Sequence, residues 1–350
     1  MPDLPKNMEE VKIEPLKPEG TAYVQKPLEL WNSRKPPKLG FLGTWRGGIY
    51  TLTAPTGTGK TAFALVLALS VAAGQDLLNI GIDKPGKVML CLGENPDETL
   101  EKLWCAALSY GVPLEEVEDN LHIVQGVYKP EAIANAMRQY GGGFDLLIID
   151  TLSVFMGLTE GMELNSNSDV LGFLNACRVE FRKDGNPTVF MPAHPTKGAT
   201  EKGKMIPFGA GSILNQIDGN FCFTSSGNDR VVLSKVGKLR GTFRHDLYFK
   251  LEYAKHDSLR DDDGQKLELP VMKPDQRGPT KRQVEMLKYL VGKRLGHNQA
   301  ARELSEVCEC SESTAGRELK YMKDQEWIEQ EKSGQFRQYR VSSAGSEWLD

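Results

Sequence analysis

The sequence predicts an α/β core with a mostly parallel sheet, followed by a small helical domain that ends in a β-hairpin. Three observations lead to this prediction. Short apolar runs alternate with helical periodicities between Phe41 and Pro192, which favours a doubly wound parallel sheet. Three β-rich runs separated by turn residues follow Asn220, and three helical patterns follow Pro279.

The elements of the core are predicted in order from these patterns. Buried strands are expected at residues 49–54, 87–92, 121–124, 144–149 and 188–192. Amphipathic helices are expected between them, at residues 61–73, 97–110, 130–140 and 169–181. The runs FCFTSS, RVVLSKV and DLYFKLE predict antiparallel strands that extend the sheet.

Four segments follow from these boundaries. Residues 1–40 are rich in Pro, Lys and Glu and predict an arm that lies on a neighbour or a loose tail. Residues 41–255 form the core. Residues 256–278, with the run Asp-Asp-Asp-Gly and several prolines, predict a linker. Residues 279–350 show three helical patterns and a hairpin around Ser333, the order of a winged helix.

Composition excludes several classes of protein. Hydrophobic residues make up 40% of the chain and charged residues 26%, as in ordinary globular proteins. No stretch is apolar enough to span a bilayer and the start lacks a signal-peptide core, so we expect a cytoplasmic protein with no membrane partner. The six cysteines are scattered, and Cys308 and Cys310 lack the second pair of ligands that a zinc site needs. The net charge of −4 means that nucleic-acid binding would depend on local basic patches.

The stretch TAPTGTGKTA, residues 53–62, predicts a phosphate-binding loop between a strand and a helix. Lys60 would reach the β- and γ-phosphates of ATP, and Thr61 would offer its hydroxyl to Mg²⁺. Alanine stands where such a loop usually opens with glycine, but this position leaves the strand and tolerates a methyl group. The predicted nucleotide-binding residues of the loop are Ala54, Pro55, Thr56, Gly57, Thr58, Gly59, Lys60 and Thr61.

Three further residues follow predicted strands and so lie at the same sheet edge. Asp150 ends the run FDLLIID and would hold Mg²⁺ alongside Thr61. Glu94, just past another strand, is the predicted general base, whereas Glu98 in the next helix suits a solvated or capping role. His194 would sense the γ-phosphate; the alternative for a single histidine is a packed or surface residue.

Together these residues resemble the RecA-like ATPases, and most closely the RepA-like hexameric replicative helicases of plasmids and phages. The resemblance covers residues 41–253 and rests on TAPTGTGKTAFAL, LGENPDE, LLIIDTLSVF and MPAHPTKG. It implies a RecA-like P-loop NTPase core, ATP and Mg²⁺ as ligands, and a homo-oligomeric, hexameric ring on single-stranded DNA. It also implies Glu94 as catalytic glutamate and His194 as γ-phosphate sensor, although the family often has a His-His pair where this chain has Ala193 and His194.

The family's DNA-facing loop corresponds to residues 194–211. The loop contains a single Glu201 and three lysines that would grip DNA phosphates without reading sequence, Lys197, Lys202 and Lys204. The alternative is a solvated surface loop.

Rings of this kind complete each active site with basic residues from the neighbouring subunit. Lys238 and Arg240, in the pattern Lys-x-Arg, match that role, with Arg240 preferred to Arg244 as the arginine finger. The alternative is that these are charges in a hairpin turn.

The C-terminal segment leaves its ligand open. Residues 273–350 contain 14 basic and 13 acidic residues, so the segment is not strongly basic. Its predicted recognition helix, 311–325, carries Arg317, Lys320 and Lys323, and the wing adds Lys332, Arg337 and Arg340. These side chains could share one DNA-binding face. Protein contacts or packing in a ring are an equal alternative.

The sequence therefore predicts an ATP-dependent DNA motor or helicase that acts as a ring on single-stranded DNA in replication or recombination. One alternative is a nucleotide-gated regulatory protein that binds DNA through its winged helix. The other is a filament-forming recombination or repair ATPase.

Overall fold

A computed structural model describes most of the chain. The described residues are 26–33, 40–157, 166–196, 205–208, 213–227, 229–243, 246–275, 281–333, 336–346 and 348–349. Residues 1–38 form a unit distinct from residues 39–350. The described element of the first unit is the short helix α1 (Pro27–Ser33).

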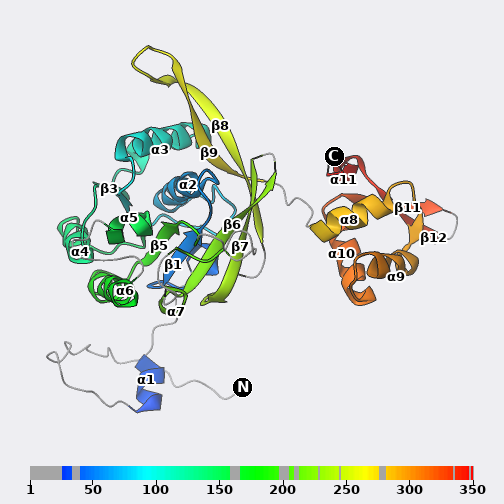
Figure 1. Cartoon of the computed structure of the whole chain (residues 1–350), viewed down its shortest axis with the longest axis horizontal. Coiled ribbons are helices and arrows are strands. Elements are labelled where there is room, and N and C mark those ends of the chain that lie inside the picture. Colours follow the sequence, from blue (N-terminus) through cyan, green and yellow to red (C-terminus); the bar gives the residue numbers. More distant parts are fainter. Residues whose placement is uncertain are drawn as a thin grey trace, which may run out of the picture. The chain divides into compact units, whose positions relative to one another are not determined.

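The described strands of the core form one nine-stranded sheet in the order β3-β2-β4-β5-β1-β6-β7-β8-β9 (Figure 1). The parallel part comprises β1 (Ile49–Thr53), β2 (Val88–Leu92), β3 (Leu121–Gln125), β4 (Leu146–Asp150), β5 (Thr188–Ala193) and β6 (Gly219–Gly227). The antiparallel part comprises β7 (Arg230–Leu239), β8 (Leu247–Arg260) and β9 (Lys266–Pro274). The predicted α/β class with a mostly parallel sheet is confirmed.

Helices cover both faces of the parallel strands, which is why every residue of β1, β2 and β4 is buried. One face packs against α2 (Lys60–Ala73) and α3 (Pro96–Tyr110). The other packs against α4 (Pro130–Gln139), α5 (Leu152–Gly157), α6 (Asn167–Arg182) and α7 (Ile213–Gln216). Two short 3-10 helices, η1 (Phe41–Gly43) and η2 (Leu114–Glu116), lie in connections. Side chains of β1 alternate between the faces: Tyr50 and Leu52 join the first core, and Ile49 joins the second.

Of two sequence predictions about the end of the core, the antiparallel strands are confirmed except where β6 meets β1, and the linker is wrong. The run FCFTSS lies in β6, which pairs parallel with β1 and antiparallel only with β7. Residues 256–278 were expected to be a linker, but residues 256–260 continue β8 and residues 266–274 form β9. The prolines of that segment are tolerated because β9 is the edge strand of the sheet, where an N–H on the outer side needs no partner.

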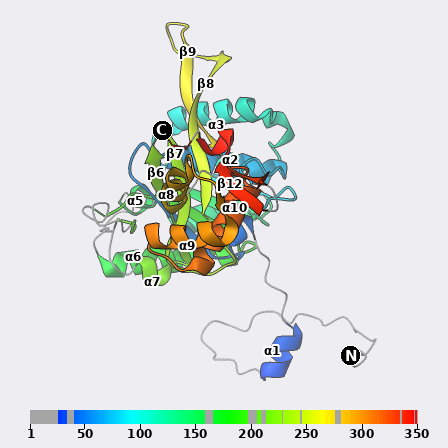
Figure 2. The ribbon, with the colours of Figure 1, turned by 90° about the vertical axis from the view of Figure 1, so that its right-hand side faces the viewer.

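The β8–β9 hairpin packs on α3 and its loop end projects beyond that helix (Figures 1 and 2). The Tyr110 hydroxyl donates to the carbonyl of Met272 at 2.6 Å. The Ser109 hydroxyl lies 2.8 Å from Nε2 of His256. These contacts attach the predicted linker firmly to the core.

The C-terminal module, residues 281–349, has its own hydrophobic core, which includes Leu287, Leu304, Leu319, Trp327 and Tyr339. Its elements are α8 (Lys281–Leu290), β10 (Leu295–Gly296), α9 (His297–Val307), α10 (Glu312–Asp324), β11 (Ile328–Ser333), β12 (Phe336–Val341) and α11 (Ser343–Ser346). Three helices followed by a hairpin is the order that the sequence predicts. Identification of the module as a winged helix stays a prediction.

Candidate active site

The turn between β1 and α2 has the backbone that a phosphate-binding loop requires. Gly57 and Gly59 have φ angles of 81° and 85°, in the left-handed region that favours glycine. A Cβ on Gly59 would lie 2.5 Å from Cε of Met272, whereas a Cβ on Gly57 would meet no atom within 4 Å. Gly57 thus leaves the mouth of the loop open, and Gly59 lets β9 pack against the start of α2.

Ala54 extends the ladder of β1 before the chain turns. Its N–H donates to the carbonyl of Ala193 at 3.2 Å, and the residue is fully buried. Its φ is not positive, so the methyl group introduces no backbone strain. Alanine therefore suits the position that opens the loop.

Lys60, the first residue of α2, is folded back against the loop. Its Nζ donates to the carbonyls of Ala54 and Pro55 at 2.8 and 2.9 Å. Burial lowers the pKa of Lys60 to about 8, although the charges of Asp150 and Glu94 counteract this shift. The ammonium group thus lies in a place that favours an anionic ligand.

Asp150 ends β4 beside the loop, with 3% of the residue exposed. Burial raises the pKa of Asp150 to about 6; Glu94 adds to the shift, and a polar contact with Thr61 and the charge of Lys60 oppose it. Its Oδ1 is buried without a hydrogen-bond partner among the described residues. A buried carboxylate oxygen without a partner beside a threonine hydroxyl fits Mg²⁺, which takes one or two protein oxygens together with phosphate and water.

Glu94 and His194 line the same cavity, which has a volume of about 240 Å³. Leu92 pairs with Asp150 in adjacent parallel strands, so Glu94 lies just beyond that pair, at the carboxyl edge. His194 follows β5, and burial and the nearby Lys60 lower its pKa. The structure thus brings Lys60, Glu94 and His194 together at one site, as predicted from their positions after strands.

Other residues of the cavity were not predicted from the sequence. Lys102 on α3 lies 2.7 Å from Glu98, and both side chains line the cavity. The side chain of Glu98 is 55% exposed in the first turn of α3, which fits the predicted solvated role, and it also pairs with a lysine at the site. Leu251, Tyr253 and Pro270 of the β8–β9 hairpin form a less polar part of the lining. Pro270 pairs directly with Tyr253 across the two strands.

Lys238 and Arg240 do not lie at this cavity. A guanidinium nitrogen of Arg240 lies 2.8 Å from Oδ1 of the buried Asp218. Asp218 also accepts from the N–H of Ile49, the first residue of β1, at 2.9 Å. Arg240 therefore lies near the amino end of β1. The phosphate loop follows the carboxyl end of the same strand, so the two lie at opposite ends of β1. Its side chain is 59% exposed, and Lys238 is exposed two residues earlier.

The lysines predicted to grip DNA, Lys197, Lys202 and Lys204, lie outside the described residues. The described ends of their loop pair with each other. The N–H of Thr196 donates to the carbonyl of Ile206 at 2.9 Å, and that of Phe208 to the carbonyl of His194 at 2.6 Å. The loop therefore starts and ends beside His194.

The predicted recognition helix is α10, on which Arg317, Lys320 and Lys323 are all exposed. Nζ of Lys323 donates to the side chain of Gln330 at 3.0 Å. Arg317 and Lys320 line a groove shared with His297, at the start of α9. The helix thus keeps two cations at one groove.

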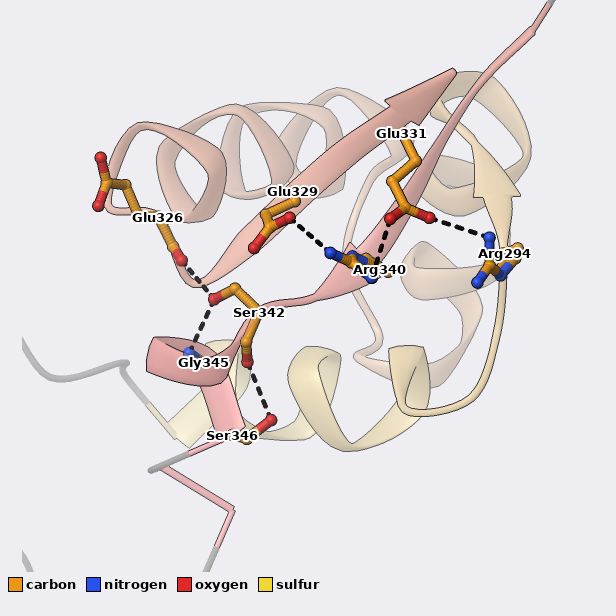
Figure 3. Close-up of polar contacts among 8 residues, drawn as sticks. All are labelled: Arg294, Glu326, Glu329, Glu331, Arg340, Ser342, Gly345 and Ser346. Carbon is orange, nitrogen blue, oxygen red and sulfur yellow. Dashed lines mark hydrogen bonds and ion pairs between the residues drawn. The ribbon is translucent and has the colours of Figure 1, made fainter. Parts of the chain in front are cut away.

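Among the described side chains of the wing, Arg337 and Arg340 do not share the basic face that the sequence leaves open as one alternative. Arg340 lies between Glu329 and Glu331, at 3.0 and 2.8 Å, and Glu331 also pairs with Arg294 at 2.9 Å (Figure 3). Side chains alternate along a strand, so Arg337 and Arg340 point to opposite faces of β12. The expectation failed because position in the sequence does not show which carboxylates lie across a hairpin.

Among the described helices, none is long and apolar enough to cross a membrane. The fold and the cavity define a P-loop nucleotide-dependent ATPase. A family model described as an AAA domain matches residues 26–200, half of the 350-residue chain, and the chain belongs to this family. A search of curated proteins finds no match. A solved structure titled "ATPase Domain of G40P" is similar at 14% identity and a TM-score of 0.47, over 64% of this chain and 86% of that chain.

Proposed function

We propose that this protein is an ATP-driven motor that moves along single-stranded DNA as a homo-oligomeric, hexameric ring and separates DNA strands as a helicase. The observation that carries the proposal is that Lys60, Glu94 and His194 line one cavity beside the phosphate loop, and that the buried Asp150 interacts with Thr61, Glu94 and Lys60 next to it. The site thus has a candidate residue for each role: binding the phosphates, holding the metal, activating the water and sensing the γ-phosphate.

The chemistry follows from the positions of these groups. The loop amides and Lys60 hold the phosphates of ATP and stabilise the charge that develops on the γ-phosphate. Thr61 and Asp150 would hold Mg²⁺, which neutralises phosphate charge when bound. Glu94 orients a water molecule and takes its proton as the water attacks. His194 contacts the γ-phosphate from the end of β5.

The edge position of Arg240 supports the ring. A side chain anchored at the amino edge of the sheet cannot reach the phosphate loop of its own subunit, because β1 alone spans about 16 Å from one edge to the other. Its exposure lets it reach the active site of a neighbouring copy instead. Lys238 would accompany it. A head-to-tail contact of this kind closes into a ring when the rotation is right.

DNA binding is proposed for Lys197, Lys202 and Lys204, whose loop begins just after His194. Lysines in a glycine-rich loop suit contacts with backbone phosphates. A ligand at this loop would act directly on the γ-phosphate sensor through the backbone bond between Phe208 and His194.

A second candidate function is supported by α10. Arg317 and Lys320 at one groove, with Lys323 further along the helix, favour a nucleotide-gated regulatory protein whose C-terminal module, as a winged helix, binds duplex DNA. The pairing of Arg340 with two glutamates counts against a basic wing.

The deciding experiment is ATP hydrolysis by the full chain with and without single-stranded DNA. We expect strong stimulation by DNA. Lys60→Ala should abolish nucleotide binding, and Glu94→Gln should keep binding while lowering kcat by about 10²- to 10⁴-fold. Two results together would favour the regulatory protein over the motor. ATP hydrolysis would not respond to single-stranded DNA, and the protein would bind a specific duplex sequence only when residues 279–350 are present.

A further inference from the structure

Three polar side chains are buried in the sheet next to the phosphate loop. Thr51 and Thr53 on β1 and Asn220 on β6 are each 0% exposed. Both hydroxyls donate to the same Oδ1 of Asn220, at 2.8 and 2.7 Å. Central parallel strands are normally apolar, and buried polar groups cost free energy unless they are hydrogen-bonded. Apolar side chains would fill this place at less cost, so the network needs another reason.

The amide of Asn220 joins this network to residues 205–208. Its Nδ2 donates to the carbonyl of Met205 at 2.8 Å. The same short segment is attached through Phe208 to the carbonyl of His194. Residues 205–208 are therefore held from two sides, by His194 and Thr196 just after β5 and by the side chain of Asn220 on β6.

The other end of the network is the strand that leads into the phosphate loop. Thr53 directly precedes Ala54, whose carbonyl accepts from Nζ of Lys60. A displacement of residues 205–208 acts on Asn220, then on the two threonine hydroxyls, and then on the strand that places Lys60. Packed strands transmit such a displacement because they deform little. This route does not pass through His194.

We propose that Asn220 is a positioning residue that couples residues 205–208 to the phosphate loop through Thr51 and Thr53. The inference rests on the proposed function, because residues 205–208 belong to the loop that we propose to bind single-stranded DNA. DNA at that loop then changes the rate of ATP hydrolysis through Asn220 as well as through His194.

The test removes the whole network while conserving volume, in the variant Thr51→Val/Thr53→Val/Asn220→Leu. Replacing the three side chains by apolar groups of similar shape leaves no orphaned hydroxyl, and the carbonyl of Met205 is the one group that loses its donor. ATPase rates of the full chain are measured with and without poly(dT). We expect basal hydrolysis within about twofold of wild type, and a ratio of stimulated to basal rate lowered by roughly 2- to 30-fold, the range of coupling mutations.

Two further variants make the result specific. Thr51→Val keeps the bonds of Asn220 to Thr53 and Met205, so it should keep most of the stimulation. In Asn220→Ser, the serine side chain is too short to bridge the threonines and Met205. If the triple variant does not fold, the stimulation of this variant by poly(dT) tests the inference. A folded triple variant or a folded Asn220→Ser variant that is stimulated as strongly as wild type would overturn this inference and leave the proposed function standing. Wild-type activity indifferent to poly(dT) would overturn both.

Discussion

At the residue scale, Lys60 and Asp150 carry charges that their surroundings compensate only in part. Burial lowers the pKa of Lys60 to about 8 and raises that of Asp150 to about 6, although the two groups attract each other. A triphosphate with its Mg²⁺ supplies a negative charge beside the lysine and a positive charge beside the aspartate. The free energy of burying these side chains is thus recovered when the ligand binds.

We expect ATP binding to take up a proton above a pH of about 8. In the free protein Lys60 loses its proton as the pH rises through its pKa of about 8, whereas bound phosphate favours the charged lysine and raises that pKa. The affinity for ATP therefore falls as the pH rises above this value. Titration calorimetry in buffers of different ionisation enthalpy measures the uptake.

Lys60→Arg is the control for this proton uptake, because a guanidinium stays charged throughout the range. ATP binding to the Lys60→Arg variant should take up no proton at this position. Equal proton uptake by wild type and Lys60→Arg would show that another group titrates.

Gly59→Ala should destabilise the protein more than Gly57→Ala. Both residues have positive φ, which costs a non-glycine residue about 1–2 kcal/mol, but only a Cβ at Gly59 would collide with Met272. Denaturant unfolding without nucleotide compares the two variants. Adding Met272→Ala should reduce the excess loss of the Gly59 variant, and equal losses for the two glycines would contradict the packing described here.

At the element scale, the β8–β9 hairpin joins distant parts of the chain into one site. It packs on α3, its residue Met272 lies against Gly59, and Leu251 and Tyr253 line the cavity. Tyr253 is 54% exposed, so its ring offers a face to a flat ligand. Because the residues proposed to hold phosphate and Mg²⁺ lie on the loop, at the start of α2 and on β4, this hairpin suits the nucleobase.

Tyr253→Ala should raise the KM for ATP by about 2- to 10-fold, the effect of losing one aromatic stacking contact. Basal kcat should change little, because Tyr253 is not among the groups that act on the γ-phosphate. Tyr253→Phe keeps the ring and should behave as wild type in steady-state kinetics. Equal KM values for ATP in Tyr253→Ala and Tyr253→Phe would show that the nucleobase does not stack on Tyr253.

The sequence predicts the parallel core well because each of its elements has a local signal. Apolar runs and helical spacing locate the strands and helices. Lys60 is found from the glycine-rich loop motif, and Asp150 and Glu94 from their places at or just beyond the end of a strand. The hairpin has no such signal. Its prolines indicate the end of regular secondary structure. The local sequence contains no sign that Met272 packs against Gly59, which is far away in the chain. The ion pairs of Arg340 were missed for the same reason, since they depend on register across a hairpin.

At the scale of the whole molecule, the candidate active site lies at the carboxyl edge of the sheet. Arg240, which we propose to enter the active site of a neighbouring subunit, lies at the amino edge. Asp218 fixes Arg240 through its side chain, and the Tyr50 hydroxyl donates to the carbonyl of Arg240 at 2.5 Å. An exposed arginine held from two sides is ready to meet a partner without much loss of side-chain freedom.

Arg240→Ala should lower kcat by about 10³- to 10⁵-fold, as expected for an arginine finger. Mixed with Lys60→Ala subunits, it should regain part of the wild-type rate, because an intact phosphate loop then meets an intact arginine across some contacts. Arg337→Ala, which changes an exposed arginine of the C-terminal module, is the control and should be fully active. Absence of recovery in assembled mixtures would show that Arg240 does not act between subunits.

The position of β9 over the phosphate loop also determines when a growing chain first holds nucleotide. The ribosome releases the loop early, but β6, which flanks β1, and β9, which packs against Gly59, are made much later. A nascent chain that ends before residue 266 lacks the strand that completes the cavity. We therefore expect a chain that ends before residue 266 to bind nucleotide more weakly than one that includes β9.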